Sequence, residues 1–350
     1  MLWLGCTIWN DAELPVPSGP ATSTSSSSSG AAPKGCDRAA IDAAVPPPSL
    51  GTGGDIDIVV AVSSITLGAK GATVDPDFGY DLDGVCTASC ISKADAAVKD
   101  ENLGRDDAMA EMLKQLQGSF NQDVASYAND AFRTGDLGIL ARIQSYNGQP
   151  NDDDVLFSLY RSPGTESGAA PDFANPNEKW KVDTTDLKSG AAGDDYTSNT
   201  SGHGFVRNGQ LIVPGLASQK IPFNGDSDIL LQKVSFVADL EEDKAAGRWR
   251  VNNAIGVGRW ATEDALQTIA HVQDPQNAKK RLCDNPLFLA IGKQVVCASA
   301  DLSLSSDTGT APCNALSAAV KFDTAPALLG AKDTPVREEA CAGIAIGGCE

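Results

Sequence analysis

Four aspartates lie close together in the stretch ATVDPDFGYDLDGVCTASC, next to a glycine that permits a sharp turn. They are Asp75, Asp77, Asp81 and Asp83. Ca²⁺ prefers several carboxylate or carbonyl oxygens that converge on one ion. The standard twelve-residue calcium loop does not fit, because its first and last ligand positions would fall on Gly79 and Cys90. A solvated acidic turn is the simpler interpretation, and the candidate ligands of a looser structural calcium site are Asp77, Asp81 and Asp83.

The two cysteines of the same stretch, Cys86 and Cys90, have the spacing of half a zinc site. A structural zinc site needs two further cysteine or histidine ligands. The chain has two histidines, His203 and His271, and both are far away in sequence. A disulfide that involves one or both cysteines is therefore the better interpretation.

The chain has nine cysteines, and the first, Cys6, follows the sequence MLWLG. This start resembles the cleavage site of bacterial lipoproteins, whose cysteine receives lipid, so we expect lipid on Cys6. An upstream start codon and a chance match both stay open. The eight remaining cysteines are enough for four disulfides, which predicts an exported, oxidised protein. The disulfide candidates are Cys36, Cys86, Cys90, Cys283, Cys297, Cys313, Cys341 and Cys349.

The segment DIDIV resembles the E-x-D-x-x-E strand of laminarinase-like glycoside hydrolases, which are β-sandwiches. Such enzymes need two carboxyl groups on one face of the strand, about 5–5.5 Å apart for a retaining mechanism. Asp55 and Asp57 fill the first two positions, but the third falls on Val60, which cannot donate a proton. We assign no catalytic residue. A polysaccharide-active hydrolase remains the alternative function, with carboxylates from distant positions such as Asp57 and Glu111.

Tryptophan side chains can stack on sugar rings, and Trp180 is the best exposed candidate. It lies in NEKWKVD, among charged neighbours, whereas Trp249 lies on an apolar face of a predicted strand. We therefore predict that Trp180 is an exposed platform for a ligand.

The overall charge is strongly acidic, with 27 basic and 46 acidic residues and a net charge of −19. Such a surface repels phosphate backbones, which argues against nucleic-acid binding. The 42% of hydrophobic residues is enough for a sizeable core. No run of about 18 apolar residues occurs, so we expect membrane association through a lipid anchor only.

Residues 1–54 are rich in Ser, Pro and Gly, which predicts a signal and lipidation region followed by a disordered tether. Residues 55–330 show mostly two-residue alternation, with helical periodicity at about 103–133 and 262–299. Asn208-Gly209 between apolar runs predicts a hairpin. We predict a mainly β fold, an antiparallel β-sandwich of jelly-roll or concanavalin-like type with two helical insertions. A cysteine-containing tail, 331–350, follows.

The segments FGYDLDGVCT, NLGRDDAMAEML, GRWATEDAL and ALSAAVKFDTAPALLG are similar to those of exported lipoproteins of myxobacterial type. The resemblance covers about residues 55–330 and implies an exported surface protein, without assigning catalytic residues. We therefore expect a bacterial cell-surface or secreted lipoprotein, anchored in the outer membrane or extracellular. It would be a non-catalytic binding or structural module for a glycan or a protein, with no cofactor beyond structural calcium. Its ligand, disulfide connectivity and oligomeric state stay open.

Overall fold

The computed structural model shows a β-rich unit with four helices. It describes residues 41, 53–70, 73–84, 90, 104–120, 124–224, 227–244, 246–274, 276–305, 311–335, 341, 344 and 346–349. Contacts divide the chain into Met1–Lys34 and Gly35–Glu350, and every described residue belongs to the second unit.

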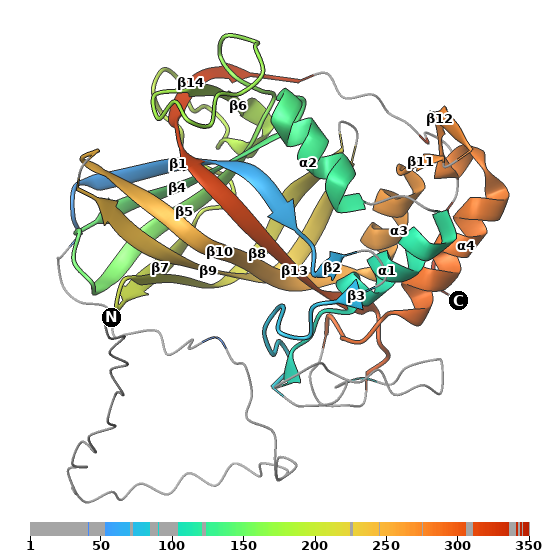
Figure 1. Cartoon of the computed structure of the whole chain (residues 1–350). Helices are drawn as coiled ribbons and strands as arrows, with labels where there is room; N and C mark the ends of the chain where they lie inside the picture. Colours follow the sequence, from blue (N-terminus) through green and yellow to red (C-terminus); the bar gives the residue numbers. More distant parts are fainter. Residues whose placement is uncertain are drawn as a thin grey trace, which may run out of the picture. The chain divides into compact units, whose positions relative to one another are not determined.

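Eight antiparallel strands form one hydrogen-bonded sheet that closes into a barrel (Figure 1). Their order around the barrel is β1-β13-β10-β9-β8-β7-β5-β4. The sheet closes because β1 pairs with β13 along one edge and with β4 along the other. The strands are β1 (Ile56–Thr66), β4 (Gly138–Tyr146), β5 (Asp152–Ser162), β7 (Gly202–Arg207), β8 (Gln210–Asn224), β9 (Ser227–Asp243), β10 (Arg248–Ala261) and β13 (Ala315–Pro326).

The alternation of side chains explains why these segments form strands around a core. In β9, Ile229 and Leu231 are buried, whereas Asp228 and Leu230, which alternate with them, are half-buried. Phe236 stacks on Phe157 of β5 across the interior, with ring centroids 4.5 Å apart. Side chains from opposite parts of the wall therefore meet in one hydrophobic core.

The β7–β8 hairpin was correctly predicted from its turn. Asn208 and Gly209 have φ angles of 51° and 82°, the left-handed conformation that a tight two-residue hairpin requires. Glycine adopts this conformation without a steric penalty, and asparagine tolerates it better than most residues.

The predicted mainly β, antiparallel fold with two helical insertions is confirmed. The expectation of a sandwich needs one refinement, because hydrogen bonds continue around the whole sheet instead of stopping at two separate sheets. Closure gives every strand of the main sheet a neighbour on both sides over at least part of its length, so none lies at an open edge along its whole length.

The helices come in two pairs, one between β3 and β4 and one between β10 and β13. They are α1 (Ala108–Phe120), α2 (Val124–Thr134), α3 (Thr262–Ala270) and α4 (Pro286–Ala298). Helix α1 packs on β13 and α4, while α3 packs on α4 and β9 (Figure 1). The side chains of α1 that face the core recur at helical spacing, as predicted: Met109, Met112, Leu113, Leu116 and Phe120. None of the helices that the structure describes is both long and apolar enough to cross a membrane.

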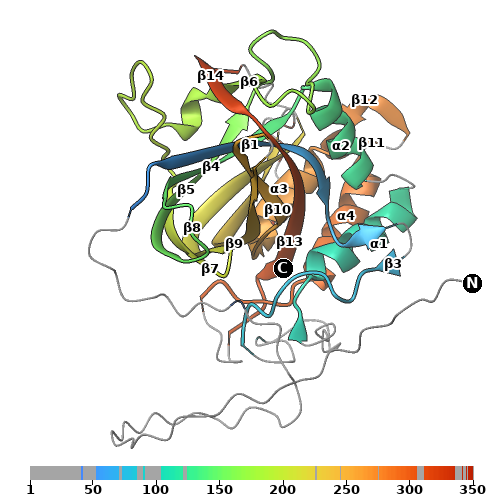
Figure 2. The ribbon, with the colours of Figure 1, turned by 60° about the vertical axis from the view of Figure 1, so that its left-hand side comes forward.

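A small parallel sheet of β6 (Lys179–Asp183) and β14 (Leu328–Asp333) lies against the outside of the barrel (Figure 2). A second hydrophobic cluster lies between this small sheet and the barrel wall. It contains Leu140 and Tyr160 from the wall and Trp180 and Val182 from β6. A 3₁₀ helix, η2 (Thr184–Asp186), follows β6 directly. The remaining short elements are β2 (Ala69–Lys70), β3 (Thr73–Val74), β11 (Gln273–Asp274), β12 (Asn277–Arg281) and η3 (Leu282–Asp284).

Three disulfides join six of the eight predicted cysteines. Such bonds persist in oxidising compartments, so they indicate an extracellular or periplasmic environment. Two of them hold the C-terminal residues 341 and 349 to the α3–α4 region. The three pairs are Cys90–Cys313, Cys283–Cys341 and Cys297–Cys349. The other two disulfide candidates, Cys36 and Cys86, and the lipidation candidate Cys6 lie outside the described residues.

Candidate functional site

The barrel wall has a gap between β5 and β8, because the strand between them is short. Strand β7 pairs with β5 as far as Phe157 and with β8 as far as Ile212. Beyond these pairs, β5 continues to Ser162 and β8 continues to Asn224. At this end of the barrel, none of the strands that the structure describes pairs with either strand on the side that faces the other.

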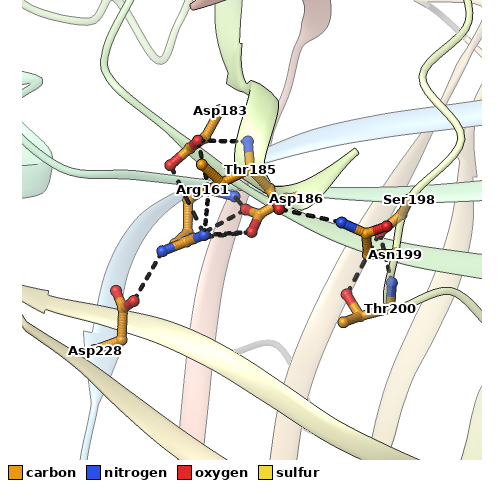
Figure 3. A network of polar contacts seen from close by, with 8 residues as sticks. All are labelled: Arg161, Asp183, Thr185, Asp186, Ser198, Asn199, Thr200 and Asp228. Carbon is orange, nitrogen blue, oxygen red and sulfur yellow. Dashed lines mark hydrogen bonds and ion pairs between the residues drawn. The ribbon is translucent and has the colours of Figure 1, made fainter. Parts of the chain in front are cut away.

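Arg161, near the end of β5, crosses this gap (Figure 3). Its Nη1 donates to Asp228 of β9 at 2.8 Å, and its Nε donates to both carboxylate oxygens of Asp186 at 3.0 Å. Its Nη2 donates to the Thr185 hydroxyl at 2.7 Å and lies 3.9 Å from the Asp183 carboxylate. The guanidinium therefore connects β5, the η2 segment and the start of β9.

The η2 segment is shaped to present these partners. Asp183 precedes η2 and accepts hydrogen bonds from the backbone N–H and the hydroxyl of Thr185, at 2.9 and 2.7 Å. Asp186 also accepts the backbone N–H of Arg161 at 2.7 Å, which is a position where a neighbouring strand would otherwise accept. The backbone N–H of Asn199 donates to the Asp186 carbonyl at 2.8 Å and draws the chain before β7 towards η2.

The electrostatics of the site are dominated by one cation among three carboxylates. Burial lowers the pKa of Arg161, but the hydrogen bonds and charge of Asp186, and then the charges of Asp228 and Asp183, outweigh it. The pKa of Arg161 therefore lies above its ordinary value, and the side chain, 8% exposed, stays charged. The lining of the adjoining cavity holds these three carboxylates and two cations, Arg161 and Lys220, so acidic groups outnumber basic ones by one.

A cavity of about 630 Å³ opens beside Arg161, within the size range of small-molecule sites. The buried side chain of Gln219 belongs to its lining, and its Oε1 accepts no hydrogen bond from the part of the chain that the structure describes. A second cavity of about 380 Å³ lies on another side of Arg161. The larger cavity is lined by Arg161, Asp183, Thr185, Asp186, Asn199, Thr200, Ser218, Gln219, Lys220, Ser227, Asp228 and Pro335.

This arrangement is suited to binding. The described lining of the larger cavity offers carboxylates, hydroxyls and amides, and it includes no aromatic ring. A glycosidase needs one carboxyl that donates a proton and a second that acts as a base or nucleophile. Here Asp186 and Asp228 both accept hydrogen bonds from the Arg161 guanidinium, which suits holding a cation or a hydrogen-bond donor instead.

The carboxylates named for a hydrolase are not brought together as a pair. Asp57 accepts from Arg142 of the neighbouring strand at 2.5 Å, and Glu111 on α1 accepts from Lys114 at 2.9 Å. Each carboxylate therefore has a different cation as its partner.

Asp106 takes the place of Asp77 in the acidic group that was predicted to bind calcium. Oxygen atoms of Asp81, Asp83 and Asp106 lie within 4.8 Å of one another, whereas Asp77 lies 3.7 Å from Arg105. Asp106 comes from the segment before α1 and pairs with Tyr80 through a β-bridge, which brings it to the loop. Sequence spacing could not reveal this residue, and calcium binding itself stays a prediction.

The prediction that Trp180 is an exposed platform is wrong. Trp180 is 1% exposed and its ring lies 5.8 Å from that of Phe173. Side chains of consecutive strand residues point to opposite faces, so Lys179 and Lys181 lie on the face of β6 opposite to Trp180. Trp180 fills the second hydrophobic cluster beneath the strand, and its charged neighbours do not indicate exposure.

The residues of the Arg161 site were missed by sequence reasoning. The available signal was a charged residue, Arg161, at the end of the otherwise apolar strand VLFSLYRS. Its partners lie about 25 and 67 positions away, at Asp186 and Asp228, so no local spacing could join them. No family model, curated protein or solved structure matches this chain.

Proposed function

We propose that this chain is a non-catalytic binding protein and that its ligand occupies the cavity beside Arg161. The observation that carries the proposal is the cavity of about 630 Å³, built around a guanidinium already held by three carboxylates. Bonds between η2, β5 and β9 hold these groups in place before a ligand arrives, which reduces the entropy lost on binding.

We propose further that the protein works at a bacterial cell surface. Three disulfides support an oxidising compartment, and lipid on Cys6 would hold the protein to the outer membrane. The resemblance to exported lipoproteins supports the same location. Mass spectrometry of the protein purified from its native host tests both points. We expect an acyl-modified Cys6 and oxidised cysteines, whereas an unmodified start with every thiol reduced would contradict the location.

The binding proposal is tested by screening the purified protein against a glycan array and a peptide library. The first variant is Ser218→Trp on β8, which fills the cavity. The matched control is Ser235→Trp, which adds the same ring at a half-buried serine of β9 that does not line the cavity. We expect a ligand that binds wild type and Ser235→Trp but loses affinity for Ser218→Trp. Binding that all three proteins share would place the ligand elsewhere and contradict the proposal.

A further inference from the structure

The part of β8 beside the cavity has a free edge. From Leu216 to Pro222, β8 pairs with β9 in a continuous register, and β7 has already ended on the other side. Each residue of a strand carries one backbone donor and one acceptor, and in an antiparallel pair alternate residues direct both groups away from the partner. One set of β8 backbone groups therefore points into the gap.

Pro222 identifies which set this is. Proline has no N–H, so within a sheet it is tolerated where that position faces away from the paired strand. Pro222 pairs with Asp228 but cannot donate an N–H to β9. The hydrogen-bonded positions of the ladder are therefore expected at Gln219 and Ile221, whose N–H and C=O groups point to β9. Ser218 and Lys220, which share the parity of Pro222, then direct their N–H and C=O groups into the gap.

The cavity follows this edge. Three consecutive residues line it: half-buried Ser218, buried Gln219 and exposed Lys220. Side chains of consecutive strand residues point to opposite faces, so one cavity touches all three when it lies along the backbone edge. The cavity therefore offers a row of backbone hydrogen-bonding groups in addition to polar side chains.

The side of the cavity opposite β8 favours a positively charged ligand group. Asp186 and Asp228 each bind Arg161, and Asp183 lies 3.9 Å from the same guanidinium, so three carboxylates face one cation on this side, while Lys220 lies on the β8 side. A lysine or arginine side chain brought here would balance this excess, whereas an acidic group would be repelled.

We propose that an extended peptide segment carrying a lysine or arginine adds to the free edge of β8 and completes the wall where β7 stops. Its backbone would pair with Ser218 and Lys220, and its basic side chain would reach the carboxylates around Arg161. Addition of a strand to an open sheet edge is a recurrent mode of peptide recognition, in which the backbone supplies affinity and side-chain pockets supply specificity. The inference rests on the proposed binding function and names the class of ligand.

The test is a selection of displayed heptapeptides on the full chain, with a glycan array in parallel and Ser218→Trp as the counter-selection. We expect selected peptides to share a central lysine or arginine. The decisive variants are Lys220→Pro, which removes an N–H on the free edge, and Lys220→Ala, which removes the side chain and keeps that N–H. Loss of one backbone hydrogen bond predicts about tenfold weaker binding to Lys220→Pro, with little change for Lys220→Ala.

Hydrogen exchange of the wild-type protein supplies a measurement that does not depend on either variant folding. We expect the amides of Ser218 and Lys220 to exchange faster than those of Gln219 and Ile221 without peptide, and to become protected when the selected peptide is bound.

The outcomes separate the two proposals. A ligand that is lost with Ser218→Trp but binds Lys220→Pro normally would overturn strand addition and leave the binding function standing. Protected Ser218 and Lys220 amides without peptide, or a concentration-dependent dimer that buries this edge, would also overturn strand addition. If neither library yields a ligand sensitive to Ser218→Trp, both proposals fail.

Discussion

Replacing Arg161 by methionine tests whether the cluster across the gap holds this end of the barrel together. Methionine keeps much of the apolar stem of arginine but removes the guanidinium from Asp186 and Asp228. The two carboxylates, each 14% exposed, are then left without the cation that compensates their burial. The variant should therefore unfold more easily than wild type.

The expected loss can be estimated in two ways. Removing one partner of a buried ion pair costs about 3–5 kcal/mol, because the remaining charge is uncompensated. Two charge-assisted hydrogen bonds, to Asp186 and Asp228, at about 1.5–3 kcal/mol each give about 3–6 kcal/mol. Screening by solvent reduces neither figure greatly, since the Arg161 side chain is 8% exposed. We expect the free energy of unfolding to fall by about 4 kcal/mol.

The assay is urea unfolding followed by circular dichroism, with the disulfides intact. Arg133→Met is the matched control, because Arg133 pairs with Asp130 at 3.1 Å while both side chains are 71% exposed. Exposed pairs of this kind contribute about 0–0.5 kcal/mol. Adding Asp186→Asn and Asp228→Asn to Arg161→Met should restore part of the loss, since neutral amides need no cation. An effect of Arg161→Met as small as that of Arg133→Met would refute the reasoning.

Three further predictions concern other parts of the molecule. Cys297→Ser together with Cys349→Ser should lower the free energy of unfolding by about 3 kcal/mol, since Cys283–Cys341 already links the two segments and leaves a loop of about 22 residues to close; denaturant unfolding would measure it. Burial raises the pKa of Asp301 to about 7, so the free energy of unfolding should fall as the pH rises from about 4 to about 7. Denaturant unfolding at several pH values should show a smaller fall for Asp301→Asn, which lacks this titrating proton. Calcium should raise the thermal midpoint of wild type but not of Asp83→Asn, and a midpoint that ignores both calcium and chelator would contradict a site at Asp81, Asp83 and Asp106.

The sign of the Asp301 prediction follows from its surroundings. Its carboxylate is buried and accepts from the backbone N–H of Ser317 at 2.7 Å and from the Ser317 hydroxyl. Burial disfavours the charged form more than these bonds favour it, and nearby Asp83 disfavours it further. The folded protein therefore holds a proton at pH values where the unfolded chain has lost it, so acid stabilises the fold in this range.

Local pattern was sufficient for the elements whose environment is local. The alternation of Ile229 and Leu231 reflects one face of a strand, and the spacing of the α1 core residues reflects one face of a helix. The turn at Asn208-Gly209 depends on those two residues alone. The cysteine content also predicted an oxidised protein, whereas the fold decides which cysteines meet and pair.

The tertiary structure alone decided closure of the sheet, the gap and its cluster. Whether β1 meets β4 depends on the accumulated twist and stagger of eight strands, which no window of residues contains. Because β7 is short, the ends of β5 and β8 are not joined by it, and residues distant in sequence, such as Asp228 against Arg161, then fill part of the space. Trp180 makes the same point, since its burial depends on which face of β6 the wall covers. Sequence determines the periodicity of each segment, whereas long-range contacts determine what each face meets.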